Sequence, residues 1–196
     1  MEAKNFVDVW PNIYLFDLLR YLIPASLFFT LFWVVGRKWW QHLFIQKTIP
    51  KQIQLWREFG YSMSTVLIFS LIGFCIHSAE QAGITLIYYT ISDYGVVYMI
   101  VSFVLTVVFH DLYFYWTHRA IHSPRLFRVF HRRHHKSNNP SPFTAYSFDL
   151  GEAAINGAFV PLWMIVVPTQ WWVVGLFMLH QIVRNTLGHS GYELFP

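Results

Sequence analysis

The sequence predicts an all-α membrane protein: a multipass bundle of about three spans and a C-terminal helical hairpin, with a cytosolic histidine-rich helical cap. Hydrophobic residues make up 55% of the 196 residues and charged residues only 12%, with a mean hydropathy of +0.38, whereas soluble domains carry about 25% charged residues. The apolar residues form runs long enough to cross a bilayer. Five of the ten histidines fall between positions 118 and 135. These features exclude a soluble globule and a disordered chain.

The length fits a single membrane domain over residues 1–196, with N-terminal membrane helices in 1–100 and a histidine-rich region in 101–196. The single cysteine excludes an intrachain disulfide framework. The net charge of +4 is better suited to orienting the chain in a bilayer than to binding nucleic acid, so we expect no nucleic-acid partner.

Three long apolar runs predict the spans, since about 20 residues cross the hydrocarbon. They are Ile13 to Val35, Phe59 to Ala79 and Tyr94 to Phe109. In the first, Asp17 and Arg20 are three residues apart and can pair near one end of the helix. We expect the third helix to continue out of the bilayer as far as His122.

The distribution of basic residues predicts the topology. The segment from Arg37 to Glu58 carries five lysines and arginines against one acid, and His118 to Lys136 carries six against none. Both should therefore be cytoplasmic. The second and third spans lie between the two segments, and two crossings return the chain to the same side of the membrane. The uncharged run from Ala153 to Val183 is too long for one crossing, and the break at Pro168 favours a hairpin. A hairpin returns His180 and His189 to the cytoplasmic side.

Three histidine motifs follow: HRAIH (118–122), HRRHH (131–135) and GHSGYELFP (188–196). Residues three or four apart share a helix face, so His118 and His122 can point at one site, and the HRRHH histidines can do so from a second helix. Ser123 and Pro124 provide a start signal for that helix.

Clustered imidazoles with no thiolates suit Fe, Zn, Cu or Ni, and five of them exceed the needs of a three-ligand site. We therefore predict a two-metal centre. Two alternatives are an interfacial basic face that binds anionic lipid headgroups and a pH sensor made of clustered histidines.

These motifs lie within the longer runs HDLYFYWTHRAIH (110–122), FHRRHH (130–135) and RNTLGHSGYELFP (184–196). A fourth run, PFTAYSFDLGE (142–152), lies between the second and the third. Together they resemble the fatty acid hydroxylase and sterol desaturase superfamily over Val101 to Pro196. The resemblance implies a histidine cap on membrane helices that binds two irons and uses O2 to hydroxylate or desaturate a lipid, with electrons from a reduced cytochrome or ferredoxin-type donor. It implies these metal ligands: His118, His122, His131, His134, His135 and His189. We expect no catalytic residue beyond the metal centre.

The chain departs from the family pattern at two places. Asp149 lies where members often have a histidine, and it is either a substitute oxygen ligand or a local loss. The family's third HxxHH box is expected beyond Pro196, so the sequence is either truncated at its C-terminus or that of a shortened member with an incomplete site.

Other residues near the motifs are candidates for supporting roles. Asp111 lies seven residues before His118 and can accept its ring N–H, or it is a helix-end acid that faces basic headgroups. Asn185, four before His189, can hydrogen-bond a ligand. Glu152 either supports a ligand or marks the membrane boundary. His110 and His180 are ambiguous between ligand and structural roles.

The leading hypothesis is a membrane-bound, O2-dependent lipid hydroxylase or desaturase with a fatty acyl or sterol-like substrate. Its histidine cluster would lie on the cytoplasmic face of a bacterial inner membrane or the endoplasmic reticulum. The main alternative is a non-catalytic or truncated family member that keeps the fold and a partial metal site. A zinc-dependent membrane hydrolase is a third reading, because zinc in the same ligands is redox-silent.

Overall fold

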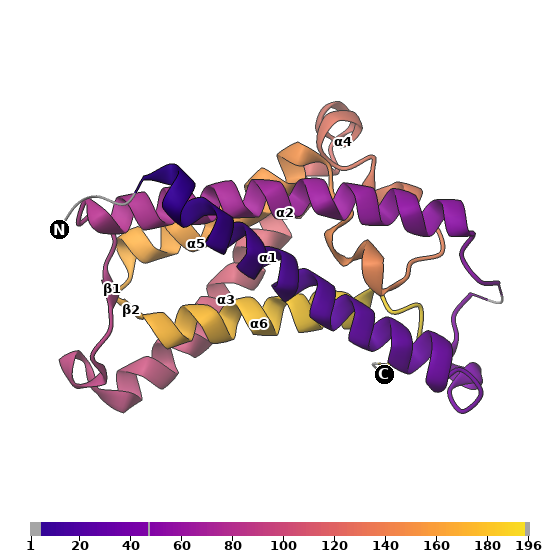
Figure 1. Cartoon of the computed structure of the whole chain (residues 1–196), viewed down its shortest axis with the longest axis horizontal. Helices are drawn as coiled ribbons and strands as arrows, with labels where there is room; N and C mark the ends of the chain where they lie inside the picture. The colour runs from indigo at the N-terminus through magenta and orange to yellow at the C-terminus, as the bar shows by residue number, and fades with distance from the viewer. Residues whose placement is uncertain (1–4, 47, 195–196) are drawn as a thin grey trace.

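The computed structural model describes residues 5–46 and 48–194, in which six α-helices dominate (Figure 1). The α-helices are α1 (Phe6–Phe29), α2 (Gln52–Gln81), α3 (Gly95–Ile121), α4 (Pro124–Phe130), α5 (Leu150–Val166) and α6 (Trp171–Gly188). A π-helical turn, η1 (Thr30–Val35), extends α1, and the 3-10 turns are η2 (Gln41–Leu43), η3 (Ile91–Asp93), η4 (His134–Lys136) and η5 (Pro142–Tyr146). Two short strands are β1 (Ile87–Tyr88) and β2 (Thr169–Gln170).

The three predicted spans are confirmed. Within the described residues, three helices are long and apolar enough to cross a membrane: Phe6–Val35, Gln52–Gln81 and Gly95–Ile121. The first begins seven residues before the predicted start, because Asn5 and Asp8 form a capping box at its N-terminus. Asp17 and Arg20 consequently lie in the interior of the helix, and their predicted place near one end was wrong.

The outer surface of α3 is apolar and exposed. Val97, Ile100 and Val104 are each more than half exposed, and the helix lies on the side of the bundle away from α1 (Figure 1). A soluble protein rarely exposes so continuous an apolar face. Lipid is the solvent that such a surface fits, which agrees with the composition.

The predicted C-terminal hairpin is also confirmed. Helices α5 and α6 have 17 and 18 residues, and they are joined by a turn at Pro168 and β2. At this turn β2 pairs in parallel with β1, with Ile87 opposite Thr169. The pairing ties the tip of the hairpin to the connection between α2 and α3, at the end of the bundle that also holds the start of α1 (Figure 1).

The segment around η5 is irregular but buried between α1, α2 and α6. Its carbonyl groups are satisfied by helix side chains: Tyr21 Oη and Ser62 Oγ donate to Phe143 O at 2.9 and 3.0 Å, and Asn185 Nδ2 donates to Ala145 O at 2.5 Å. Non-helical backbone in a membrane protein needs such partners. These bonds fix the loop directly after the HRRHH motif.

The chain after α6 is tied to the region after α1. Trp33 Nε1 donates to Ser190 O at 2.8 Å, Tyr192 Oη donates to Phe32 O at 2.8 Å, and Tyr192 forms an antiparallel bridge with Phe44. Gly191 allows this turn with a φ of +81°. The contacts hold the end of α6, and with it His189, against the rest of the bundle.

Candidate metal centre

The end of α3 carries the first pair of histidines. His118 lies in its last turn and His122 is the residue at which the helix ends. Their Nε2 atoms are 3.2 Å apart and their ring centroids 4.8 Å apart. The one-turn spacing therefore turns both imidazoles to the same point, as the sequence predicted.

The HRRHH motif does not lie on the predicted second helix. Ser123 and Pro124 do start α4, but the helix ends at Phe130, His131 follows it as the cap, and His134 begins the separate turn η4. The chain leaves the helix here because the backbone N–H of Arg133 donates to Asp149 Oδ2, at 2.7 Å. The three histidines converge through this turn rather than through helical periodicity.

Asp149 holds the turn with both carboxylate oxygens. Besides Oδ2, which accepts from the Arg133 backbone, Oδ1 lies 3.0 Å from Arg133 Nε. The guanidinium also lies over the ring of Tyr61, 5.0 Å from its centroid. Asp149 thus fixes Arg133, one of the two residues between His131 and His134, and this engagement argues against the substitute oxygen ligand considered from the sequence.

His131 is the centre of the cluster and is fully buried. Its ring centroid lies within 5.3 Å of four other imidazoles, at 4.5 Å (His118), 4.6 Å (His122), 5.3 Å (His134) and 4.6 Å (His135). Its Nδ1 lies 2.8 Å from Glu152 Oε2. Glu152 comes from the first turn of α5, so the hairpin carries the carboxylate to the cluster.

His189 brings the end of α6 to the cluster. Its Nδ1 lies 2.8 Å from the backbone carbonyl of Asn185, and its Nε2 lies 3.3 Å from His134 Nε2. Donation to a carbonyl leaves the lone pair on Nε2, directed at His134. Asn185 was expected to hydrogen-bond a predicted ligand; its backbone carbonyl lies beside His189 Nδ1, while its side chain donates to Ala145 O.

The donor set fits a metal. Nε2 of His131 is buried without a hydrogen-bond partner in the described chain, which is costly unless another ligand satisfies it. Two nitrogens bound to one metal at about 2.1 Å lie roughly 3.0 to 4.2 Å apart. The 3.2 and 3.3 Å nitrogen pairs fall in that range, and donor atoms of His118, His122 and His131 all lie within 4.8 Å of one another.

The imidazoles are held in the neutral form that binds metals. Burial, followed by the neighbouring His189 and His131, lowers the pKa of His134 to about 3. Burial also lowers the pKa of His122, His135 and His189. Burial, reinforced by Asp149, raises the pKa of Glu152 to about 9. Neutral imidazole lone pairs are therefore available at neutral pH.

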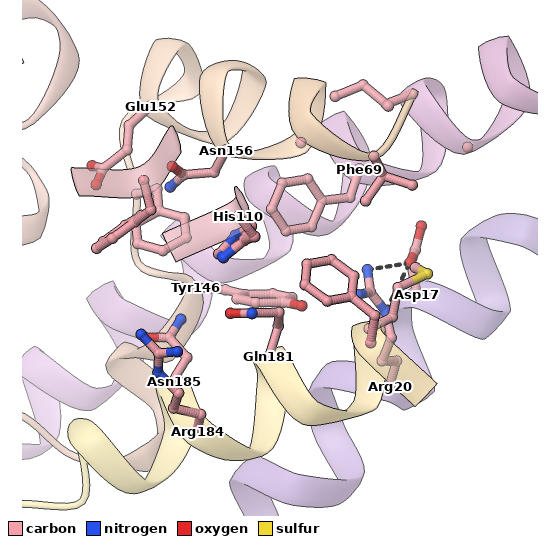
Figure 2. A pocket seen from close by; sticks show the side chains of 18 of the residues that line it. Asp17, Arg20, Phe69, His110, Tyr146, Glu152, Asn156, Gln181, Arg184 and Asn185 are labelled. Atoms are coloured by element: carbon pink, nitrogen blue, oxygen red, sulfur yellow. Dashed lines mark hydrogen bonds and ion pairs between the residues drawn. The ribbon is translucent and has the colours of Figure 1, made fainter. Parts of the chain in front are cut away.

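A cavity of about 760 Å³ opens beside the cluster. His118, His134 and His189 form part of its wall, and most of the remaining lining is apolar, from α1, α2, α5 and α6. Its volume lies within the usual range of about 300–1,000 Å³ for ligand sites. Figure 2 shows the cavity from close by, with Tyr146 between the Glu152 and Asn185 side and the Asp17 and Arg20 side.

Three predicted residues lie outside the cluster. Asp111 accepts both of its short bonds from Arg184 Nη1, at 2.8 Å to each oxygen, rather than from the ring of His118. His110 packs between Phe159 and Phe177 in the cavity wall. His180 packs edge-on against Phe103 and is not part of the cavity lining.

The sequence reasoning missed the cavity residues of the N-terminal half. Asp17 and Arg20 were recognised as a pair but not as part of a site, and Tyr146 was not singled out. An ion pair in the middle of a membrane helix was the available signal, since charges there are usually functional. The arrangement as a whole is that of a multipass membrane protein with a histidine cluster at one end of a lipid-sized cavity.

Residues 103–196 match the fatty acid hydroxylase family. The chain is also similar to Delta(7)-sterol 5(6)-desaturases of Aspergillus fumigatus, at 32% identity over 51% of this chain and 31% of the relative, and of Gibberella zeae, at 28% over 76% and 44%. The Saccharomyces cerevisiae enzyme of that name is 25% identical over 84% and 44%. These matches confirm the predicted resemblance to the fatty acid hydroxylase and sterol desaturase superfamily. The chain spans less than half the length of these relatives, and no solved structure matches it significantly.

Proposed function

We propose that this chain is a membrane-bound, O2-dependent lipid desaturase or hydroxylase that works through two histidine-held irons. The observation that carries the proposal is the convergence of six imidazoles from α3, the HRRHH turn and α6, three of which line an apolar cavity. Metal ligands and a space for a lipid thus adjoin one another.

The distances suggest how the ligands divide. Donor atoms of His118, His122 and His131 all lie within 4.8 Å of one another, so these three residues would hold one ion. His134 and His189 form the second close pair and would bind the other. The ring of His135 lies 4.6 Å from that of His131 and 5.0 Å from that of His122, so its position suits the first group.

Iron with O2 supplies the oxidising power that an unactivated C–H bond requires, which acid-base groups and zinc cannot supply. The protein's own residues orient the metal ligands and exclude water. Glu152 and the Asn185 carbonyl hold His131 and His189 in place. The apolar lining, including Phe114 and Phe148, keeps water from the reacting carbon and holds a substrate methylene beside His118 and His134.

The substrate that the relatives favour is a sterol, because those proteins are Delta(7)-sterol 5(6)-desaturases. The positive charge of the 37–58 and 118–136 segments favours a cytoplasmic histidine cluster. Electrons would then reach it from a reduced cytochrome or ferredoxin-type donor on that side. We also propose that residues 1–196 act as one membrane domain.

The test is iron content and oxidation by the purified chain in lipid nanodiscs, supplied with a chemical reductant and cholest-7-en-3β-ol. We expect about two irons per chain, O2 uptake that depends on the sterol, and an oxidised sterol by mass spectrometry. His131→Ala should lose both the iron and the product. His42→Ala, which removes an exposed histidine outside the cluster, should keep both.

The other outcomes would contradict the proposal. Bound zinc with activity that needs neither O2 nor a reductant would favour the hydrolase reading. A folded protein that binds no transition metal would favour a non-catalytic family member.

A further inference from the structure

The cavity has an unusual polar feature in its wall, on the side formed by α1. Asp17 and Arg20 lie among apolar residues such as Ile13, Phe69 and Ile72. In Figure 2 the two charged side chains point toward each other, across Tyr146 from Asn185. The pair lies outside residues 103–196, the part of the chain that matches the family.

The ion pair is buried. The exposed fraction of the side chain is 4% for Asp17 and 12% for Arg20. Arg20 Nε and Nη2 donate to the same oxygen, Asp17 Oδ1, at 3.1 and 2.5 Å. The guanidinium also lies 5.9 Å from the ring centroid of Phe69 and 6.0 Å from that of Tyr146. Helix α1 and these rings therefore hold the pair in one orientation.

The pair leaves hydrogen-bonding capacity in the cavity. Within the described part of the chain, Asp17 Oδ2 accepts no hydrogen bond, since both bonds from Arg20 go to Oδ1. Asp17 uses two of the five N–H donors of the guanidinium. Charged groups inside a membrane are costly and usually mark a substrate or ion site, whereas two leucines would serve packing alone.

These groups match a hydroxyl better than they match other lipid head groups. A hydroxyl both donates and accepts, so it can donate to Asp17 Oδ2 while it accepts from Arg20. The pair is neutral overall, because one carboxylate offsets one guanidinium. A free fatty acid would bring its own carboxylate next to Asp17, which like-charge repulsion disfavours in this low-dielectric site.

We propose that Asp17 and Arg20 bind the hydroxyl group of an uncharged lipid whose apolar body fills the cavity up to the histidine cluster. The assignment of the far end of this lipid to the cluster rests on the proposed function. The cavity wall between the ion pair and the histidine cluster is aromatic. The ring of Tyr146 adjoins Arg20, the ring centroids of Tyr146 and Phe148 are 6.2 Å apart, and those of Phe148 and His134 are 5.4 Å apart. Binding at the ion pair thus sets which carbon lies beside the metals.

The experiment measures equilibrium binding of two matched probe sets to the metal-free chain in nanodiscs. The first set is cholest-7-en-3β-ol and cholest-7-ene, which differ only in the hydroxyl. The second is hexadecan-1-ol and hexadecanoate, which differ in charge. We expect each alcohol to bind more tightly than its partner, and the sterol hydroxyl to contribute roughly 10- to 100-fold, as hydrogen bonds to charged groups do.

Variants then test whether Asp17 and Arg20 are responsible for the preference for the alcohols. Asp17→Leu with Arg20→Leu removes both charges together, so no unpaired charge is left, and should bring the ratio of sterol to cholest-7-ene affinities to about one. Asp17→Asn leaves Arg20 positive and should reverse the second set in favour of hexadecanoate. Asn12→Leu changes an exposed polar residue of the same helix outside the cavity and should retain both preferences.

The inference is overturned if the original chain binds both members of a set equally, binds neither sterol probe nor hexadecan-1-ol, or prefers hexadecanoate. It is also overturned if the double variant keeps the preference. Should the double variant fail to fold, as judged by its elution and melting temperature, the charge reversal in Asp17→Asn decides. The binding measurement uses the metal-free chain, so its result does not depend on oxidation. A holoprotein that fails to oxidise the sterol would therefore count against the proposed function but not against this inference.

Discussion

The histidine cluster and the cavity adjoin each other but are built differently. The cluster is held by short polar bonds at the ends of elements, among them Arg133 N to Asp149 and His189 Nδ1 to the Asn185 carbonyl. The cavity is enclosed by apolar faces of long helices, with close approaches at residues such as Gly157. The difference suggests a rigid polar frame at the histidine cluster and a packed apolar wall around the cavity.

The largest expected effect concerns the side of the membrane on which the cluster lies. Glu193→Cys, introduced in a Cys75→Ala background to remove the exposed native thiol, should react with a membrane-impermeant maleimide added from the cytoplasmic side of oriented vesicles. The hairpin returns the end of α6 to the end of the bundle that holds the cluster. Labelling from the opposite side alone would contradict the topology.

The polar frame should be sensitive to small changes. Glu152→Gln keeps the shape of the side chain but replaces the carboxyl group beside His131 Nδ1 with an amide. Partners of metal-bound histidines contribute about 10- to 100-fold to metal affinity, so we expect a loss of that size in iron titrations. Glu80→Gln, which alters a half-buried carboxylate that accepts from Tyr89 Oη away from the cluster, is the matched control. Equal affinities would show that Glu152 has no role in the frame.

The packing of the cavity wall should respond to side-chain volume. A Cβ at Gly157 would lie 2.5 Å from Ile72 Cδ1 and 3.1 Å from Phe69 Cδ1, whereas one at Gly175 would meet nothing within 4 Å. Gly157→Ala should therefore destabilise the protein by about 1–3 kcal/mol through overpacking. Gly175→Ala, on the other arm of the hairpin, should not. Thermal unfolding in detergent measures both, and equal stability would contradict the packing described here.

The different ways in which the histidine cluster and the cavity are built explain how much of each could be predicted from the sequence. Spans, hairpin and histidine pairs follow from local patterns: apolar runs, the break at Pro168, and one-turn spacing in His118 and His122. The turn at HRRHH could not be predicted, because it depends on Asp149, 16 residues from Arg133. The cavity could not be predicted either, since Arg20 and Tyr146 meet only after α1 packs against η5.

The smallest expected effect is the pH dependence of the metal-free protein. Burial lowers the pKa of His134 to about 3, against about 6.5 in the unfolded chain. Below pH 6.5 the unfolded state therefore binds more protons, and stability falls as the pH decreases toward 3. The melting temperature should drop between pH 7.5 and pH 5. His134→Gln should reduce the drop and His42→Gln should not; an unchanged drop in His134→Gln would refute the burial argument.

The most direct test of the two-metal centre is X-ray absorption spectroscopy of the iron-loaded chain. Convergence of His118, His122, His131, His134, His135 and His189 predicts a nitrogen-dominated shell at about 2.1 Å, with the outer-shell scattering of imidazole rings. It also predicts a second iron at roughly 3.5–4 Å. Iron surrounded by water oxygens, without imidazole scattering or a neighbouring metal, would contradict the account.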